Sequence, residues 1–110
     1  MVIVRNLNGS GRNFPKPTCG CKSWIDHWNI NKYPNAENMA SWCCGCRKKT
    51  ESVALCGGHV VKVCSQDKNR YIIPLCASCN AKDDAQFNVN ISDLVSANCN
   101  NCVTKERLRS

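Results

Sequence analysis

The chain has 110 residues, with 15 Lys or Arg against 8 Asp or Glu, so its formal net charge is +7. Aromatic residues make up only 6% of it, which limits the apolar core that a chain of one-domain length can build. This excludes a large multi-domain protein, and no segment is apolar for long enough to span a bilayer. We therefore expect a single domain over residues 1–110, stapled by its eleven cysteines.

In the first half of the chain, residues 2–4 (Val-Ile-Val) predict a short strand. Ser23 is a suitable N-cap for a helical turn over residues 23–28. That turn would place Trp24 and Trp28, four residues apart, on the same face, where they can pack a small core.

The second half has a more regular pattern, in which β-branched runs are separated by turn residues. We expect a break in the first run at Gly57-Gly58, and we expect a later strand to end at Pro74. The expected elements are a loop over 29–38, strands over 52–55, 59–63 and 70–75, a short helix from about 79 to 82, a strand over 87–91 and a frayed basic tail over 104–110.

The cysteines come in tight pairs, of which three have the spacing Cys-x-x-Cys. Two thiolates at this spacing can curl around one ion while backbone amides point at the sulfurs, and two such knuckles complete a tetrahedron. The odd cysteine count and an N-terminus that turns polar too early for a secretory signal also favour metal over disulfides. We therefore predict one or two Zn²⁺ ions and a cytoplasmic location. A secreted disulfide-rich effector is the weaker alternative.

The order of motifs between residues 43 and 82 is informative. A Cys43-x-x-Cys46 pair precedes a strand containing Gly-Gly-His59, and a hairpin return leads into Ile-Pro-Leu-Cys76-x-x-Cys79-Asn80. This order resembles the zinc-bearing members of the HNH (His-Me finger) nuclease family. The resemblance implies a small α+β, zinc-stabilised domain with a treble-clef, HNH-like ββα unit. It also implies that the structural zinc is held by Cys43, Cys46, Cys76 and Cys79.

The same resemblance implies roles for two further residues. His59 matches the family's general base, and Asn80 matches a ligand of its catalytic divalent ion. The sequence departs from the family at Gly58, where a metal ligand is usual, and at Tyr71, where an orienting Asn is usual. A divalent ion held by one neutral oxygen donor would bind weakly. We therefore expect a degenerate catalytic centre and a non-catalytic module. The alternative is a metal-dependent HNH-type endonuclease with an altered active site.

The remaining cysteines suggest a second zinc site that closes the two ends of the chain around one ion. Its expected ligands are Cys19, Cys21, Cys99 and Cys102. His27 is a rival ligand. The Cys56-x-x-His59 pair is another, so His59 can be read as a zinc ligand, a vestigial base or a structural hydrogen-bonding residue.

The positive net charge and its distribution indicate which partners the protein could bind. Arg47, Lys48 and Lys49 follow the first cysteine pair directly and are candidate contacts for a phosphate backbone. Two zinc ions with four thiolates each would lower the net charge from +7 to about +3. We therefore expect weak, salt-sensitive binding to nucleic acid, or binding to a protein partner, and no membrane association.

Overall fold

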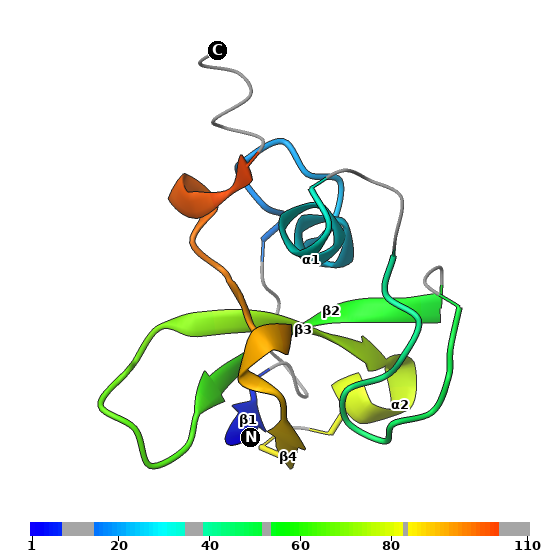
Figure 1. The fold of residues 1–110 in the computed structure, drawn as a ribbon, viewed down its shortest axis with the longest axis vertical. Helices are drawn as coiled ribbons and strands as arrows, with labels where there is room; N and C mark the ends of the chain where they lie inside the picture. The colour runs from blue at the N-terminus through cyan, green and yellow to red at the C-terminus, as the bar shows by residue number, and fades with distance from the viewer. Residues whose placement is uncertain (8–14, 35–38, 52–53, 83, 104–110) are drawn as a thin grey trace.

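The computed structural model describes residues 1–7, 15–34, 39–51, 54–82 and 84–103. It is a small α+β fold built on a five-stranded antiparallel sheet with the strand order β4-β1-β2-β3-β5 (Figure 1). In the described residues, no helix is sufficiently long and apolar to cross a membrane. The elements in chain order are β1 (Val2–Asn6), α1 (Trp24–Lys32), β2 (Leu55–Lys62), β3 (Arg70–Cys76), α2 (Ala77–Asn80), β4 (Gln86–Val89), the 3-10 helix η2 (Ile91–Asp93), β5 (Val95–Ser96) and the 3-10 helix η3 (Cys99–Asn101).

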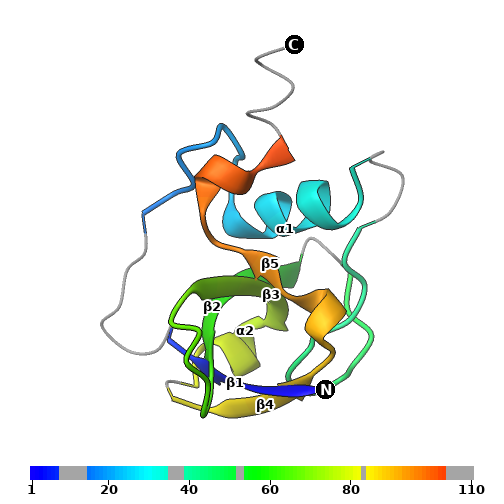
Figure 2. The same ribbon diagram turned by 60° about the vertical axis from the view of Figure 1, so that its left-hand side comes forward.

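The β2–β3 hairpin is the centre of the fold, with seven residue pairs in register from Leu55↔Cys76 to Val61↔Arg70. Helix α1 lies on one side of it, and α2 lies on the other (Figures 1 and 2). The interior is aliphatic and fully enclosed, and its most buried apolar side chains are Val4, Val60, Ile72, Ile73, Leu75 and Val89.

The expected break at Gly57-Gly58 is wrong, because β2 runs through both glycines without interruption. A Cβ at Gly57 would lie 2.5 Å from the Trp24 backbone, and a Cβ at Gly58 would lie 2.5 Å from a Leu75 methyl carbon. These glycines therefore allow α1 and the Leu75 side chain to approach the strand from opposite sides.

Helix α1 begins where the sequence predicts, since Ser23 is its N-cap and accepts a 3.2 Å hydrogen bond from the Asp26 amide. It continues to Lys32, so the loop expected from residue 29 is wrong over its first four residues. Two contacts explain the extra turn. Trp28 is buried, and the Asn29 side chain accepts a 2.7 Å hydrogen bond from the Ala40 amide.

The other expected elements are found with shifted ends. The strand expected over 2–4 is β1, and the strand expected to end at Pro74 continues to Cys76. Pro74 is tolerated because β5 pairs only with Tyr71 and Ile72, so no strand requires an N–H group from the proline on that edge of β3. Helix α2 begins before its expected start, and the strand expected over 87–91 ends at Val89. Residues 52, 53 and 104–110 lie outside the described residues.

Asn6 at the end of β1 anchors α2 to the sheet. The side chain is fully buried, and its amide nitrogen donates to the carbonyl oxygens of Asn80 and Lys82, both at 2.9 Å. A third, longer contact of 3.4 Å reaches the Cys79 carbonyl oxygen. Because the last carbonyls of a helix have no partner within the helix, this one side chain caps the C-terminal end of α2.

We predict that Asn6→Asp destabilises the fold by about 1–3 kcal/mol, because it replaces the donor with an acceptor and leaves buried carbonyls without their partner. Asn88→Asp is the matched control, since Asn88 is exposed on β4. Chemical denaturation of both variants measures the difference. Equal midpoints for the two variants would contradict the capping role.

Candidate metal centres

Residues 42–49 form a small hairpin, called here the knuckle hairpin. Trp42 pairs with Lys49, and the Cys43 amide donates to the Lys48 carbonyl at 3.0 Å. The turn closes with Arg47 in the left-handed region, at φ 66°, and its amide bonds the Cys43 carbonyl at 2.9 Å. The hairpin thereby turns Cys43 and Cys46 toward the same point.

Cluster 1 consists of the sulfur atoms of Cys43, Cys46, Cys76 and Cys79, which all lie within 4.8 Å of one another. The knuckle hairpin supplies the first two, and the junction of β3 and α2 supplies the other two. A 2.9 Å hydrogen bond from the Cys44 amide to the Pro74 carbonyl holds the two parts together. The structure thus brings together the four cysteines that the sequence assigns to the first site, in a geometry able to bind a metal ion.

The backbone around cluster 1 favours thiolate at one position. Burial raises the pKa of Cys43, but backbone N–H groups of Cys46, Cys76 and Gly45 point at its sulfur and lower the pKa to about 7. Burial and the adjacent thiols raise the pKa of Cys79 to about 12. Four sulfurs this close cannot all ionise without a cation, so a bound metal ion is what would allow them to.

Gly45 allows the knuckle hairpin to approach α2. A Cβ at this position would lie 2.9 Å from the Phe87 ring and 3.0 Å from the Cys79 sulfur. The first distance is shorter than a Cβ contact allows, and the second requires the sulfur to shift by a few tenths of an ångström. A larger residue at this position would therefore press on the Cys79 sulfur, which belongs to cluster 1.

Cluster 2 lies beside α1 and consists of Cys19, Cys21, His27 and Cys102, again with ligand atoms within 4.8 Å of one another. The Cys19 sulfur is 3.5 Å from the Cys21 sulfur and 3.4 Å from His27 Nδ1. The Cys21 sulfur is 3.7 Å from the Cys102 sulfur. Gly20 reverses the chain between the first two cysteines with φ 94°, a conformation that favours glycine.

The second nitrogen of His27 fixes the orientation of its ring. Nε2 lies 2.8 Å from the Ser96 carbonyl oxygen, and because that oxygen can only accept, Nε2 carries the proton. The lone pair is then on Nδ1, which faces the sulfurs. A histidine that donates its other N–H to a carbonyl is the usual arrangement of a metal-ligating histidine.

Asn31, which sequence reasoning missed, lies one helical turn after His27 in α1 and contacts cluster 2. Its side-chain nitrogen donates to the His27 carbonyl at 2.7 Å and contacts the Cys102 sulfur at 3.3 Å. Its side-chain oxygen accepts from the Val103 amide at 3.0 Å. The spacing of four residues from His27 was the available signal, but it has meaning only if the helix extends past residue 28.

Cys99 does not belong to the group of four, although the sequence places it in the second site. Its thiol lies beside Cys19, and despite burial its pKa is lowered by hydrogen bonds from Thr18 and Cys19. His27, the rival ligand, is the fourth member of the group, because α1 places its ring beside the Cys19 sulfur. Cys99 is left as a neighbour of the cluster.

The other rival pair, Cys56 and His59, cannot form a knuckle. Both residues lie in the continuous strand β2, where side chains three apart point to opposite faces. His59 is 3% exposed and its ring packs edge-on against Trp24, with centroids 4.7 Å apart. Burial lowers its pKa to about 4.

The two residues that would serve catalysis are also apart. A Cβ at Gly58 would lie 3.2 Å from the Asn80 side-chain oxygen, so Asn80 lies on the α2 side of β2. His59, the next residue, points to the α1 side. Tyr71 pairs with Val60 rather than His59, and its hydroxyl donates to Asp67. The side chains of His59 and Asn80 therefore do not converge on one point.

All eleven cysteines lie in the described residues, and all are free thiols. Cys44 is half-buried, and burial together with the Asp93 carboxylate raises its pKa to about 12. Cys64 is exposed in the turn after β2. Neither belongs to a cluster.

Comparison of the chain with protein-family models, with curated proteins and with solved structures finds no match.

We predict that Gly45→Ala weakens metal binding at cluster 1 by roughly 10- to 100-fold, the range expected when the surroundings of a ligand are displaced. Competition with a chromophoric chelator measures the affinity of each site. Lys48→Ala, an exposed residue of the same hairpin, is the control. Unchanged affinity in the Gly45→Ala protein would contradict the expected displacement of the Cys79 sulfur.

We also predict that His27→Ala releases one ion per chain, whereas Cys99→Ser keeps the full metal content. Native mass spectrometry counts the ions. Cobalt substitution counts thiolates, because sulfur-to-cobalt absorption scales with their number, and the two clusters together offer seven. The reverse result, with metal lost from Cys99→Ser and kept in His27→Ala, would establish the four-cysteine site.

Proposed function

We propose that the protein is a zinc-stabilised, non-catalytic binding module with a treble-clef, HNH-like scaffold, and that it binds nucleic acid. The observation that carries this proposal is the geometry of the two clusters. Tetrahedral Zn²⁺ with Zn–S bonds of about 2.3 Å has sulfurs about 3.8 Å apart, and a nitrogen and a sulfur about 3.6 Å apart. Sulfur pairs at 3.5, 3.7 and 4.0 Å and a sulfur–nitrogen pair at 3.4 Å are close to these values.

The same distances argue against the disulfide alternative. Bonded sulfurs are about 2.05 Å apart, well short of the separations in either cluster. Thiols that are kept reduced and bound to metal suit a cytoplasmic protein.

The order of elements supports the treble-clef assignment. The knuckle hairpin, the β2–β3 hairpin and α2 follow one another, and the second cysteine pair spans the start of α2. This is the order that the resemblance to zinc-bearing HNH proteins implies. The separation of His59 from Asn80 favours the non-catalytic form of that scaffold.

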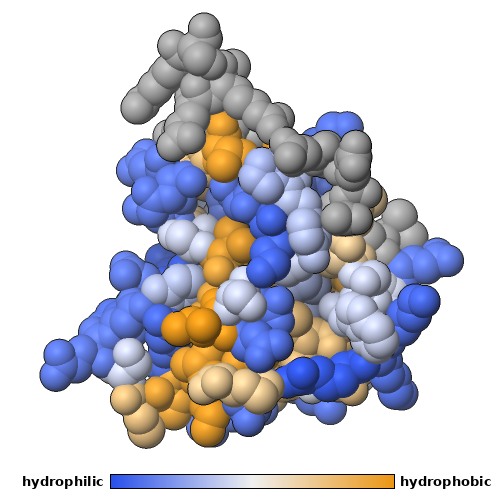
Figure 3. Space-filling view, in the orientation of Figure 1, coloured by the Kyte–Doolittle hydropathy of each residue, from blue (hydrophilic) through white to orange (hydrophobic). Residues whose placement is uncertain are grey.

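The remaining charge favours nucleic acid as the partner. A Zn²⁺ ion with four thiolates has a charge of −2, and one with three thiolates and a histidine has −1, so the formal charge falls from +7 to about +4. Arg47, Lys48 and Lys49 are all exposed on the knuckle hairpin. Hydrophilic residues cover much of one face, while apolar ones gather near β1 and β4 (Figure 3).

Binding should be weak and should fall steeply with salt, because it depends on the release of counterions from phosphates. Fluorescence anisotropy with labelled DNA and RNA at increasing ionic strength measures the slope. We predict that Lys48→Glu combined with Lys49→Glu lowers affinity for every sequence alike. Lys68→Glu, an exposed lysine outside the knuckle hairpin, is the control. If no nucleic acid binds even at low salt, the proposal fails and a protein partner is favoured instead.

A further inference from the structure

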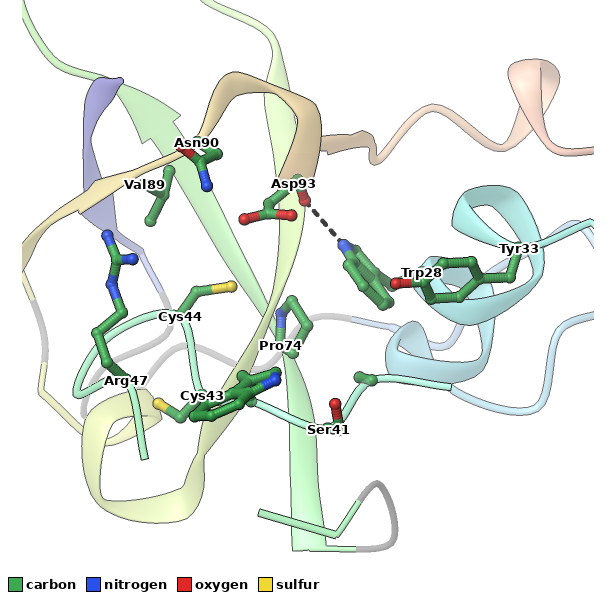
Figure 4. Close-up of a pocket in the computed structure, with 12 residues that line it drawn as sticks. Trp28, Tyr33, Ser41, Cys43, Cys44, Arg47, Pro74, Val89, Asn90 and Asp93 are labelled. Atoms are coloured by element: carbon green, nitrogen blue, oxygen red, sulfur yellow. Dashed lines mark hydrogen bonds between the residues drawn. The ribbon is translucent and has the colours of Figure 1, made fainter. Parts of the chain in front are cut away.

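A pocket of about 370 Å³ opens between α1, the knuckle hairpin and η2 (Figure 4). Its size is within the range of small-molecule sites. Three aromatic residues line it, namely Trp28, Tyr33 and Trp42. Trp28 and Tyr33 are part of the hydrophobic core or pack against it, whereas Trp42 is exposed at the pocket.

The inner wall of the pocket is rigid. Trp28 is 4% exposed, donates from its indole nitrogen to the Asp93 carbonyl oxygen at 2.8 Å, and packs edge-on against Tyr33 with centroids 5.8 Å apart. Cys43 of cluster 1 also lines the pocket. Metal binding and pocket shape are therefore linked through the knuckle hairpin.

The outer wall is different. Trp42 is 55% exposed, although it is among the largest apolar side chains of the molecule. Lys49 lies directly opposite it in the knuckle hairpin, so both side chains project to the same face. An exposed indole beside a run of basic residues is the arrangement in which bases stack while phosphates bind alongside.

The polar groups of the pocket come mainly from η2 and its N-cap. The Asp93 carboxylate and the Asn90 side chain both lie at the pocket (Figure 4). The Asp93 carboxylate is 3.9 Å from Lys32 Nζ, longer than a hydrogen bond, so it retains acceptor capacity. Guanine is the base whose pairing edge presents adjacent N–H donors, which a carboxylate can accept together.

The charges favour a neutral occupant over a cation. The Asp93 carboxylate has one cation, Lys32 Nζ, at 3.9 Å. A second cation, Arg47, also lines the pocket, and its guanidinium donates to the Asn88 carbonyl oxygen. A neutral planar base in the pocket would leave its phosphate outside, beside Lys48 and Lys49. An alkylammonium group would meet two cations and one carboxylate.

We infer that this pocket takes one unpaired guanine base from a single-stranded nucleic acid, with Trp42 as the stacking platform and Asp93 as the acceptor for the N–H edge. The inference rests on the proposed nucleic-acid binding and adds to it a preference for single strands and for guanine.

The test uses the metal-loaded full chain and fluorescence anisotropy of labelled DNA pentamers, namely TTGTT, TTATT and TTTTT, with a 12-base-pair duplex for comparison. We expect the guanine pentamer to bind roughly 5- to 100-fold tighter than the other two, the discrimination typical of a bidentate contact. Trp42→Ala should weaken all three pentamers by roughly 5- to 100-fold, as loss of a stacking platform does. Met39→Ala is the control, because Met39 is similarly exposed and does not line the pocket.

Asp93→Asn should abolish the guanine preference and leave affinity for TTATT and TTTTT within about twofold. Glu51→Gln, an exposed carboxylate elsewhere, should change nothing. Circular dichroism and metal content confirm that each variant is folded. Asp93→Asn protein that keeps the guanine preference would overturn the role of the carboxylate.

Three other outcomes overturn the inference, and they show whether the proposed function fails with it. If duplex and single strands bind alike with a steep salt dependence, the pocket is not used and backbone binding stands. If nothing binds, both fail. If a trimethyl-lysine peptide quenches tryptophan fluorescence and TTGTT does not, the pocket takes an alkylammonium group instead.

Discussion

The fold depends on the crowding of four thiols at the junction of β3 and α2. Four sulfurs within 4.8 Å repel one another when ionised, so this point is stable only when the thiols are protonated or share a cation. Several backbone N–H groups already point at Cys43 and lower its pKa to about 7, although burial opposes this. The backbone is thus arranged for thiolate before any ion is bound. A metal ion would join the two cysteines of the knuckle hairpin to the two cysteines at the start of α2.

The two clusters connect segments that are not part of the sheet, namely residues 19–21, the knuckle hairpin and Cys102. Cluster 1 joins the knuckle hairpin to the α2 side of the β2–β3 hairpin. Cluster 2, on the α1 side, joins Cys19 and Cys21 to α1 and to Cys102 near the C-terminal end of the described chain. A chain with a small aromatic content would otherwise have little apolar surface to order these segments. A metal ion bound at each cluster would order these segments as a larger core does in other domains.

The knuckle hairpin contributes both to cluster 1 and to the surface proposed to bind a partner. The same eight residues present two ligands to cluster 1, expose three basic side chains and position Trp42 at the mouth of the aromatic pocket. If cluster 1 holds a metal ion, its loss would disturb all three features together, and with them the proposed binding of a partner. His59, by contrast, takes no part in these features. Its ring is buried against Trp24, and burial lowers its pKa, so it packs as a neutral side chain.

The sequence by itself determined the local features of this protein. The N-cap at Ser23, the β-hairpin and the residues of cluster 1 could be predicted because each is encoded by spacing within a few residues or by an ordered motif. Only the tertiary structure decided the rest. It selected His27 over Cys99, used Asn6 to cap α2, and pointed His59 and Asn80 to opposite faces. These outcomes depend on how segments that are distant in the sequence pack against one another. A local pattern specifies a pair of cysteines without specifying which other residues will lie beside that pair.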